Sequence, residues 1–500
     1  MNAPMQHAPP PHAVVIGAGF GGIAAALRLR AKGYRVTVID RCSAIGGRAQ
    51  VFERDGFRHD AGPTVITAPF LFEELFALFG ERLSDHVNLV PMKPWYRFRF
   101  ADGDTFDYGG TLEEPLAEIA RIEPRDCDGY LALLAHSRRI FDVGFTELSA
   151  VPFDRLGTML SQIPRLLKLQ SYKTVWGLVS TYLSHPKLRQ AFSIQPLLVG
   201  GNPFDTTSIY GLIHFLERAY GVHFAMGGTG AITRALGDLM QRQSIDVMLD
   251  TSIEALILQE RTATGVRLAD GRIIEADLIV SNADPTHLYR HLIPKKNQAR
   301  MTRVKLATAH YSMGLFVLYF GTTRTYPGVA HHTIWMGERY QSLLKDIFDR
   351  QLLAEDFSLY LHRPTATDPS FAPAGCDSFY VLCPVPNLQG RVDWQQQAPL
   401  LRQRIVAALG STILPDLEST ITADFWMTPE DFRDDYCSTH GAGFSIAPIF
   451  RQSAWFRFHN RAEGIRNLYL VGAGTHPGAG LPGVLCSAKV VDSMIAPVSA

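Results

Sequence analysis

The segment Ala13–Asp40, AVVIGAGFGGIAAALRLRAKGYRVTVID, reads as a strand, a glycine-rich turn, a helix and a second strand. The apolar run from Ala13 to Ile16 predicts a buried parallel strand. Gly17, Gly19 and Gly22 then match the G-x-G-x-x-G spacing. In that motif the first glycine makes the tight turn, the second lets the backbone approach a pyrophosphate, and the third lets the helix pack on the strand. The segment therefore predicts a dinucleotide site.

The rest of this segment supports the same interpretation. The phosphates are expected at the helix N-terminus, where free N–H groups and the positive end of the helix dipole favour an anion. The second predicted strand, Arg35 to Ile39, ends at Asp40, which is twenty-three residues after Gly17. This is near the spacing expected for the acid that accepts hydrogen bonds from a ribose. Phe20 at the start of the helix and Arg41 beside the acid are included among the expected cofactor contacts.

Length and composition set limits on the remaining chain. Its 500 residues predict two or more lobes, because single cores stop growing at about 250–300 residues. The 48 basic and 48 acidic residues cancel, so the net charge gives no reason to expect a nucleic-acid partner. The six cysteines show neither a C-x-x-C pair nor a zinc spacing, which predicts reduced thiols in a cytoplasmic chain and no metal site.

The sequence also predicts no targeting or spanning segment. The first twelve residues, MNAPMQHAPPPH, have neither a basic nor an apolar region, and we expect a short disordered lead-in and not a signal peptide. No run of 18 or more apolar residues lacks charges, which argues against a transmembrane helix.

A second glycine turn, Ile45–Ala49, follows the predicted ribose acid. Gly47 allows close backbone approach, and Arg48 can meet a phosphate or the edge of a cofactor ring. On its own the motif would be interpreted as a surface turn, but its position one loop beyond Asp40 favours the cofactor.

The segment Gly56–Thr64 predicts a strand that runs into a glycine–proline turn. His59 and Asp60 are neighbours on that strand and should point to opposite faces, so a structural role is expected for both.

Three motifs together identify a family: the Ala13–Asp40 fingerprint, the GGRA turn and the segment DAGPTVIT (Asp60–Thr67). They resemble the FAD-containing amine-oxidase-type superfamily, and DAGPTVIT resembles the bacterial phytoene desaturases in particular. The resemblance implies FAD, where the fingerprint alone leaves FAD and NAD open. It also implies cofactor contacts from Gly62, Pro63 and Thr64.

The middle of the chain is apolar and basic. Phe145–Leu183 has the composition of an interfacial helix pair that lies in a membrane surface, with Arg165 and Lys168 among its cations. An ordinary amphipathic core helix is about as compatible with the pattern. A carotenoid substrate, which resides in the bilayer, would favour the membrane interpretation. Leu197–Leu212 resembles the desaturases as well and is expected to line a substrate tunnel.

The nucleotide-binding lobe is expected to resume near Gly221. Met226–Ala231 predicts a glycine turn that opens a helix over Ile232–Gln241 and either covers the isoalloxazine or merely caps the helix. Asp246–Leu258 and Gly265–Val280 predict strands around an Asp-Gly hairpin. The resemblance implies that backbone groups at Ile253 contact the adenine.

Residues 300–460 predict mixed strands and helices, with buried strands over 316–321, 354–361 and 378–382. The adjacent His331 and His332 lack the spacing that places two metal ligands on one helix face, and a structural role is predicted for them.

The other decisive stretch is Asn467–Met494, NLYLVGAGTHPGAGLPGVLCSAKVVDSM, which predicts a strand, a glycine-rich loop and a helix that starts near Pro482. A helix N-terminus there would offer N–H donors to the negative charge that collects on the pyrimidine edge of a reduced flavin. Many superfamily members carry an acid where this chain has Ala473. His476 is the best candidate for a proton acceptor, although an indirect hydrogen-bonding role is favoured, and no catalytic residue is assigned.

The predicted fold is α/β, with a Rossmann-type FAD-binding domain and an inserted α+β domain for substrate binding and membrane association. The FAD-binding domain is expected in residues 1–80, 221–290 and 462–500, and the substrate domain in 81–220 and 291–461. The residues expected to bind the cofactor are Gly17, Gly19, Phe20, Gly22, Asp40, Arg41, Gly47, Arg48, Gly62, Pro63, Thr64, Ile253, Gly472, Ala473, Gly480, Leu481 and Pro482.

The resemblance implies a phytoene desaturase that dehydrogenates a C40 polyene in successive steps to neurosporene- or lycopene-type carotenoids. Oxygen or a membrane quinone would reoxidise the flavin, and the protein is expected at the inner face of the cytoplasmic membrane. A carotenoid isomerase or a later-step desaturase on the same fold is the alternative enzyme. A flavin-free isoprenoid escort protein is the alternative from another class.

Overall fold

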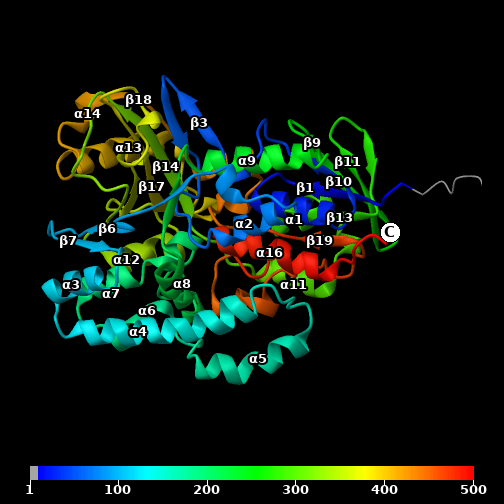
Figure 1. The fold of residues 1–500 in the computed structure, drawn as a ribbon, viewed down its shortest axis with the longest axis horizontal. Helices are drawn as coiled ribbons and strands as arrows, with labels where there is room; N and C mark the ends of the chain where they lie inside the picture. Colours follow the sequence, from blue (N-terminus) through cyan, green and yellow to red (C-terminus); the bar gives the residue numbers. More distant parts are fainter. Residues whose placement is uncertain (1–8, 500) are drawn as a thin grey trace, which may run out of the picture.

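A five-stranded parallel sheet carries the segments at both ends of the chain. The computed structural model describes residues 9–499. In this sheet the order of strands is β19 (Leu468–Leu470), β13 (Leu278–Ser281), β1 (His12–Ile16), β2 (Arg35–Ile39) and β9 (Asp246–Met248). All four neighbouring pairs are parallel. Figure 1 shows these strands together on the right-hand side of the molecule, close to the C-terminus.

The register of this sheet explains how the two termini meet. Ala13 of β1 lies opposite Val36 on one side and Leu278 on the other. Ile279 then lies opposite Leu468, so β13 joins the N-terminal strand to the C-terminal one. The predicted α/β fold with a Rossmann-type sheet is confirmed.

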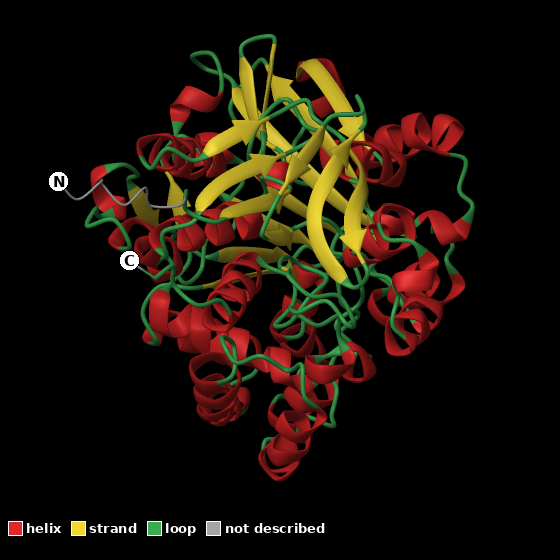
Figure 2. Ribbon diagram, turned by 90° about the vertical axis from the view of Figure 1, so that its right-hand side faces the viewer, coloured by secondary structure: helices red, strands yellow, loops and turns green. Residues whose placement is uncertain are grey.

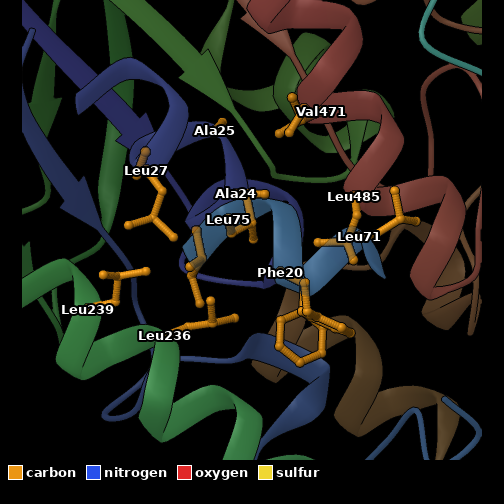
Figure 3. Packing of buried hydrophobic residues seen from close by; sticks show 14 of the residues in the cluster. Phe20, Ala24, Ala25, Leu27, Leu71, Leu75, Leu236, Leu239, Val471 and Leu485 are labelled. Carbon is orange, nitrogen blue, oxygen red and sulfur yellow. The ribbon is translucent and has the colours of Figure 1, made fainter. Parts of the chain in front are cut away.

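Helices α1 (Phe20–Ala31), α2 (Phe70–Ala77), α9 (Thr229–Arg242) and α16 (Leu481–Met494) surround this sheet with apolar side chains. Figure 3 shows Leu27 of α1 near Leu239 of α9, and Leu485 of α16 beside Leu71 of α2. These side chains are at most 3% exposed. Burying one leucine side chain contributes about 1.5–3 kcal/mol to the free energy of folding. The packing of these four helices therefore stabilises the glycine-rich turns that precede α1 and α16.

A seven-stranded mixed sheet forms the second layer and appears as the large yellow group in Figure 2. Its order is β18 (Ile421–Met427), β14 (Gly314–Thr322), β17 (Asp377–Val385), β16 (Leu359–His362), β15 (His332–Trp335), β6 (Tyr96–Arg99) and β7 (Thr105–Tyr108). Every residue of β14 is buried, as expected of a central strand that is covered on both faces.

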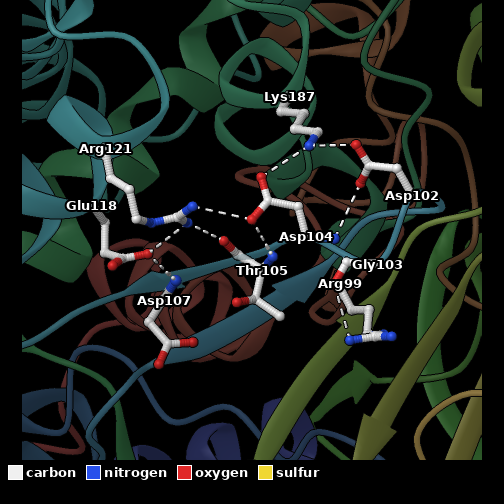
Figure 4. Close-up of polar contacts among 9 residues, drawn as sticks. All are labelled: Arg99, Asp102, Gly103, Asp104, Thr105, Asp107, Glu118, Arg121 and Lys187. Atoms are coloured by element: carbon white, nitrogen blue, oxygen red, sulfur yellow. Dashed lines mark hydrogen bonds and ion pairs between the residues drawn. The ribbon is translucent and has the colours of Figure 1, made fainter.

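A helical layer packs against this sheet and is seen at the lower left of Figure 1. It contains α3 (Glu113–Ile122), α4 (Asp126–Phe141), α5 (Leu156–Lys168), α6 (Val175–Tyr182), α7 (Pro186–Phe192) and α8 (Leu212–Tyr220). Polar contacts tie it to the β6–β7 hairpin (Figure 4). Lys187 Nζ lies 2.6 Å from Asp102 Oδ2 and 2.9 Å from Asp104 Oδ2, and Arg121 Nη1 lies 3.1 Å from Asp104 Oδ1.

The remaining elements connect these layers. The strands are β3 (Val51–Arg54), β4 (Phe57–Asp60), β5 (Leu89–Pro91), β8 (His223–Ala225), β10 (Ile253–Gln259), β11 (Thr262–Leu268) and β12 (Ile273–Glu275). The helices are α10 (Pro285–His287), α11 (Arg300–Thr308), α12 (Tyr340–Lys345), α13 (Trp394–Gly410), α14 (Leu417–Thr420) and α15 (Pro429–Tyr436).

Three predicted elements differ from the structure. The helix predicted over 232–241 begins earlier, at Thr229, because the glycine turn itself supplies its first residues. The strand predicted over 246–258 is broken into β9 and β10, which belong to different sheets. Of the strand predicted over 354–361, only the end is extended, in β16.

The strands of the parallel sheet all lie in segments assigned to the FAD-binding domain, and those of the seven-stranded sheet lie in the substrate-domain segments. The domain boundaries themselves stay a prediction. Within residues 9–499, no helix combines the length and the apolar character needed to cross a bilayer. Most of the predicted disordered lead-in lies outside the described residues.

Candidate functional site

A cavity of about 850 Å³ lies where the parallel sheet, the seven-stranded sheet and the helical layer meet. Its lining residues come from the segments 16–21 and 472–486 at the two ends of the chain and 194–217 in its middle, among others. Every residue predicted to bind the cofactor lines this cavity except Gly22. The fold therefore gathers segments that are far apart in the sequence around one space.

The glycine turn after β1 is closed by Asp40. The backbone N–H of Ala18 donates to Asp40 Oδ2 at 2.6 Å, and the N–H of Cys42 donates to Asp40 Oδ1 at 2.8 Å. Asp40 is 8% exposed and lines the cavity. Each carboxylate oxygen can accept a second hydrogen bond, so Asp40 can hold the turn and still receive a ribose hydroxyl.

Gly22 lies behind the cavity wall and sets how closely α1 packs on β1. A Cβ atom at this position would lie 1.9 Å from the carbonyl oxygen of Gly17. The turn can therefore form only when residue 22 has no side chain. This is the role that the spacing predicted for the third glycine, and it is a packing role and not a direct contact.

The second glycine turn and the turn after β4 meet at Arg48. A Cβ atom on Gly62 would lie 2.0 Å from the Arg48 carbonyl oxygen, so the two backbones are in close contact. The guanidinium of Arg48 donates to the carbonyl oxygen of Gly443 and to Ser438 Oγ. Its burial lowers the pKa of this guanidinium from the usual value. Arg48 is thus a fixed positive charge at the cavity wall.

The C-terminal loop is held in place by a buried arginine. Arg457 is 1% exposed, and its guanidinium donates to the carbonyl oxygens of Ala473 at 2.6 Å and Thr475 at 2.9 Å. On the other side of the loop, the N–H of Gly472 donates to Ser487 Oγ of α16 at 2.8 Å. These contacts fix the loop that precedes α16 against the cavity.

Two helices begin at the cavity without a capping side chain from the described residues. The N-cap residues are Gly19 for α1 and Gly480 for α16. The first N–H groups of such helices have no partner within the helix and need an acceptor. Both glycines line the cavity, so two positive helix ends face it. This is the arrangement that a pyrophosphate and the electron-rich edge of a flavin require.

The part of the cavity formed by the middle of the chain is mostly apolar. Its lining includes Leu197, Leu198, Val199, Ile209, Leu212, Ile213, Met159, Leu166, Ile334 and Leu359. A hydrocarbon surface of this kind offers few polar partners and favours an apolar ligand.

One acidic residue interrupts this apolar wall. Glu217 of α8 is 1% exposed and accepts a hydrogen bond from Tyr96 Oη at 2.8 Å, while its Oε2 atom has no partner among residues 9–499. Burial raises the pKa of the Glu217 carboxyl to about 7, against the opposing effects of Tyr96 and Arg218. The group therefore keeps its proton to a much higher pH than an exposed glutamate does.

His476, the candidate proton acceptor, also lines the cavity. Its Nε2 atom lies 3.2 Å from the Leu148 carbonyl oxygen, which can only accept, so Nε2 carries the proton. Burial lowers the pKa of His476 to about 4. The imidazole is consequently neutral at pH 7. The geometry does not distinguish His476 from Glu217 as a catalytic group, and the catalytic residue stays unassigned.

A family model matches almost the whole chain, including nearly all of the segments that line the cavity. Residues 20–491 match the family described as "Flavin containing amine oxidoreductase". The chain belongs to this family. The flavin-containing amine oxidoreductase family confirms the predicted cofactor, FAD, and the predicted enzyme class, an oxidoreductase.

Relatives and solved structures agree with this membership. The chain is 47% identical over 483 residues to "Phytoene desaturase (lycopene-forming)" of Pseudescherichia vulneris, covering 96% of this chain and 98% of that protein. It is 43% identical to "Phytoene desaturase (neurosporene-forming)" of Rhodobacter capsulatus, with 97% and 93% covered. The fold matches that of cyclohexylamine oxidase from Brevibacterium oxydans with a TM-score of 0.63 at 15% identity, covering 98% of this chain and 99% of that one.

The residues present fit FAD. Asp40 is placed to receive the ribose, the N-terminus of α1 to receive the pyrophosphate, and the N-terminus of α16 to receive the pyrimidine edge. The absence of an acid at Ala473 leaves the backbone N–H groups of this loop as donors. The individual cofactor contacts stay predictions.

Three functional residues were missed by sequence reasoning. Arg457 holds the C-terminal loop, Glu217 faces the cavity, and Asn282 fills the space beside the glycine turn. A Cβ atom on Gly19 would lie 2.8 Å from Asn282 Nδ2. Asn282 directly follows β13, and because β13 pairs with β1, the carboxyl end of that strand was a place to look for it.

Proposed function

We propose that this protein is an FAD-dependent phytoene desaturase that acts on C40 polyenes. The observation that carries the proposal is the single cavity, in which a wall suited to a dinucleotide continues into an apolar wall suited to a hydrocarbon. The full-length similarity to lycopene-forming and neurosporene-forming desaturases supports the same substrate class.

Bound FAD supplies a two-electron acceptor, so that one allylic carbon gives up a hydride, the neighbouring carbon gives up a proton, and a new double bond forms. The chain contributes positioning and the exclusion of water. The glycine turn and Asp40 would hold the dinucleotide, and the N-terminus of α16 would offer N–H donors to developing negative charge. The apolar residues from 194–216 would orient the hydrocarbon.

The alternatives fit the observations less well. An isoprenoid escort protein without flavin would have no use for two uncapped helix ends at its cavity, nor for the fixed Arg48. A carotenoid isomerase or a later-step desaturase would use the same cavity, and only the product distinguishes them from a phytoene desaturase.

The product test uses FAD-loaded protein with phytoene in liposomes, followed by chromatography of the polyenes. We expect neurosporene or lycopene with earlier intermediates at short times. Recovery of unchanged phytoene by a protein that remains yellow would contradict the substrate assignment. Conversion of lycopene but not of phytoene would instead identify a later-step enzyme.

We also propose that helix α5 attaches the protein to a membrane surface. Leu156, Leu160, Ile163 and Leu167 are 40–57% exposed and follow the i, i+4, i+7, i+11 spacing of one helix face. Other side chains of the same helix, Met159, Gln162 and Leu166, line the cavity. Figure 1 shows α5 at the edge of the molecule. A helix placed in this way would connect the bilayer, where a C40 hydrocarbon dissolves, with the cavity.

The membrane proposal is tested by exchanging exposed leucines. Leu160→Ser with Leu167→Ser should reduce sedimentation with anionic liposomes, because two apolar contacts with the acyl region are lost. The control is Leu352→Ser with Leu400→Ser, since these leucines are 55% and 50% exposed on other elements. Equal sedimentation of both double variants would contradict the role of α5. Arg165 forms an ion pair with Glu147 at 2.6 Å, whereas Lys168 has no such pair among the described residues, so Lys168 is the first cation to replace in a test of the basic side chains.

The proposal also covers the location of the protein and its electron acceptor. Attachment through α5 is a peripheral mode, which suits the inner face of the cytoplasmic membrane as the working site. Oxygen or a membrane quinone would then be the electron acceptor. Turnover in oxygen-free liposomes with and without added quinone separates the two acceptors.

A further inference from the structure

A group of three histidines and one aspartate is buried just behind the cavity wall. His332 begins β15 and lies directly opposite His362, the last residue of β16. His331 precedes β15, and Asp60 ends β4. His331 is 6% exposed, Asp60 is 1% exposed, and the other two are fully buried. We refer to these four residues as the histidine cluster.

The polar atoms of the histidine cluster are unusually free of partners. The Nε2 atoms of all three histidines and both carboxylate oxygens of Asp60 have no hydrogen-bond partner among the described residues. A single weak contact, 3.8 Å between His362 Nε2 and Asp60 Oδ2, links the aspartate to the ring next to it. Burying a carboxylate without a cation or a donor is costly. Among the described residues, only the ring of His362 lies within ion-pair distance of the Asp60 carboxylate, and the nearby Arg363 is paired with Asp377 at 2.8 Å.

The histidines are also preset for ligation. The Nδ1 atom of His331 lies 2.7 Å from Thr367 Oγ1, and the Nδ1 atom of His332 lies 2.7 Å from Tyr360 Oη. When these Nδ1–H groups donate to the hydroxyls, the lone pairs at Nε2 remain free. Such outer hydrogen bonds are what fix the ring orientation and tautomer of metal-binding histidines.

The surroundings keep the rings uncharged. Burial, and secondly the neighbouring histidines, lower the pKa of His331 and His332 well below the usual value. Phe224 covers His331 at a centroid distance of 4.6 Å. Neutral imidazole is the form that binds a metal.

We propose that the histidine cluster is a binding site for a divalent transition metal, with zinc as the preferred ion. Three imidazole nitrogens supply ligands of the kind that zinc takes, and the Asp60 carboxylate, 3.8 Å from His362 Nε2, would complete a tetrahedral set by moving closer to the ion. One ligand atom from each histidine already lies within 4.8 Å of the others. Zinc bonds of about 2.0–2.1 Å bring such atoms to roughly 3.3 Å, so each ring needs to move by about 1 Å or less.

This proposal departs from the sequence prediction, in which His331 and His332 were structural and no metal was expected. The sequence shows only that His331 and His332 are neighbours in the chain. Strand pairing adds His362 from thirty residues further along the chain, and β4 adds Asp60 from the other direction. A bound metal would also fix part of the cavity wall. It would hold the ring of His332, whose Nδ1–H can donate to the hydroxyl of Tyr360. Tyr360 lines the cavity, and its hydroxyl oxygen lies 2.6 Å from Thr64 Oγ1.

The test measures metal content and does not depend on the proposed substrate. The full-length protein is purified with FAD, dialysed against a weak chelator, and analysed by plasma mass spectrometry. We expect close to one zinc per chain in the wild-type protein and a loss of most of it in the double variant His331→Gln with His362→Gln. The control is His214→Gln, because His214 is equally buried but lies outside the cluster.

A second measurement covers the case in which the double variant fails to fold. Wild-type protein stripped of metal is titrated with Co²⁺, and a tetrahedral site is expected to give strong visible ligand-field absorption together with a higher melting temperature. Zinc-free wild-type protein that shows neither cobalt absorption nor a change of melting temperature with zinc would overturn the proposal. The cluster would then be structural.

Discussion

The buried carboxyl of Glu217 should make the stability of the protein depend on pH in a way that can be measured. Its carboxyl has a pKa of about 7 in the folded chain because it is buried, against 4.5 as the ordinary value. Between these two values the unfolded chain is ionised while the folded chain holds the proton. The contribution of Glu217 to stability should therefore be fully present below pH 4.5 and should be lost as the pH rises through 7.

The magnitude follows from the size of the shift. Each unit of difference between the folded and unfolded pKa values changes the free energy of unfolding by about 1.4 kcal/mol. The shift of the Glu217 pKa therefore lowers the free energy of unfolding by roughly 3 kcal/mol as the pH rises from 4.5 to above 7. Glu217→Gln keeps the shape and removes the titration. Relative to the wild-type chain, this variant should therefore gain about 3 kcal/mol in free energy of unfolding when the pH is raised from 4.5 to 8.

The assay is urea unfolding of both proteins at several pH values, together with infrared spectroscopy of the protonated carboxyl. The carboxyl band that titrates near pH 7 should be missing in Glu217→Gln. As a control, Glu463→Gln breaks the 2.6 Å pair with Lys305 and should lower stability without removing that band. If the stability difference between Glu217→Gln and wild type stays constant across this pH range, Glu217 is ionised in the folded protein and the reasoning is refuted.

Three other changes follow from the site. Gly22→Ala should abolish flavin retention, because its Cβ would lie 1.9 Å from the Gly17 carbonyl oxygen; Gly157→Ala, which meets nothing within 4 Å, should remain yellow. Arg457→Lys should loosen the C-terminal loop and weaken FAD binding in a fluorescence titration, since a charged hydrogen bond contributes about 1.5–3 kcal/mol and several are lost. His476→Asn should leave the pH profile of turnover unchanged between pH 6 and 8, because the pKa of His476 is about 4; the disappearance of a limb near pH 6.5 would show that His476 titrates during turnover.

The local strand–turn–helix units were predictable from sequence because their rules are local. Gly17 begins the N-terminal glycine turn, and Gly480 ends the C-terminal glycine loop as the N-cap of α16. The geometry of both depends on a few neighbouring residues, and the apolar runs beside them determine which faces are buried. The same holds for Asp40, whose distance from the first glycine is fixed by one helix and one strand.

The positions that sequence reasoning missed depend on strand pairing and helix packing across long separations. Arg457 gains its role only because the loop at Ala473 folds onto it. The three histidines come together only through the pairing of β15 with β16. The break between β9 and β10 is different, because the polar segment Asp250–Ser252 lies where the chain leaves one sheet for another, and Asp250 has a positive φ of 48°. These residues are a turn signal that sequence reasoning did not use.

In the proposed function, hydrocarbon and flavin share one cavity. This is measured directly by an anaerobic titration of the FAD-loaded protein with phytoene in liposomes, followed by the visible absorbance of the flavin. We expect the flavin to be bleached as phytoene is added and its colour to return when oxygen or quinone is admitted. A flavin that keeps its colour at saturating phytoene, while dithionite still bleaches it, would show that phytoene does not reach the flavin.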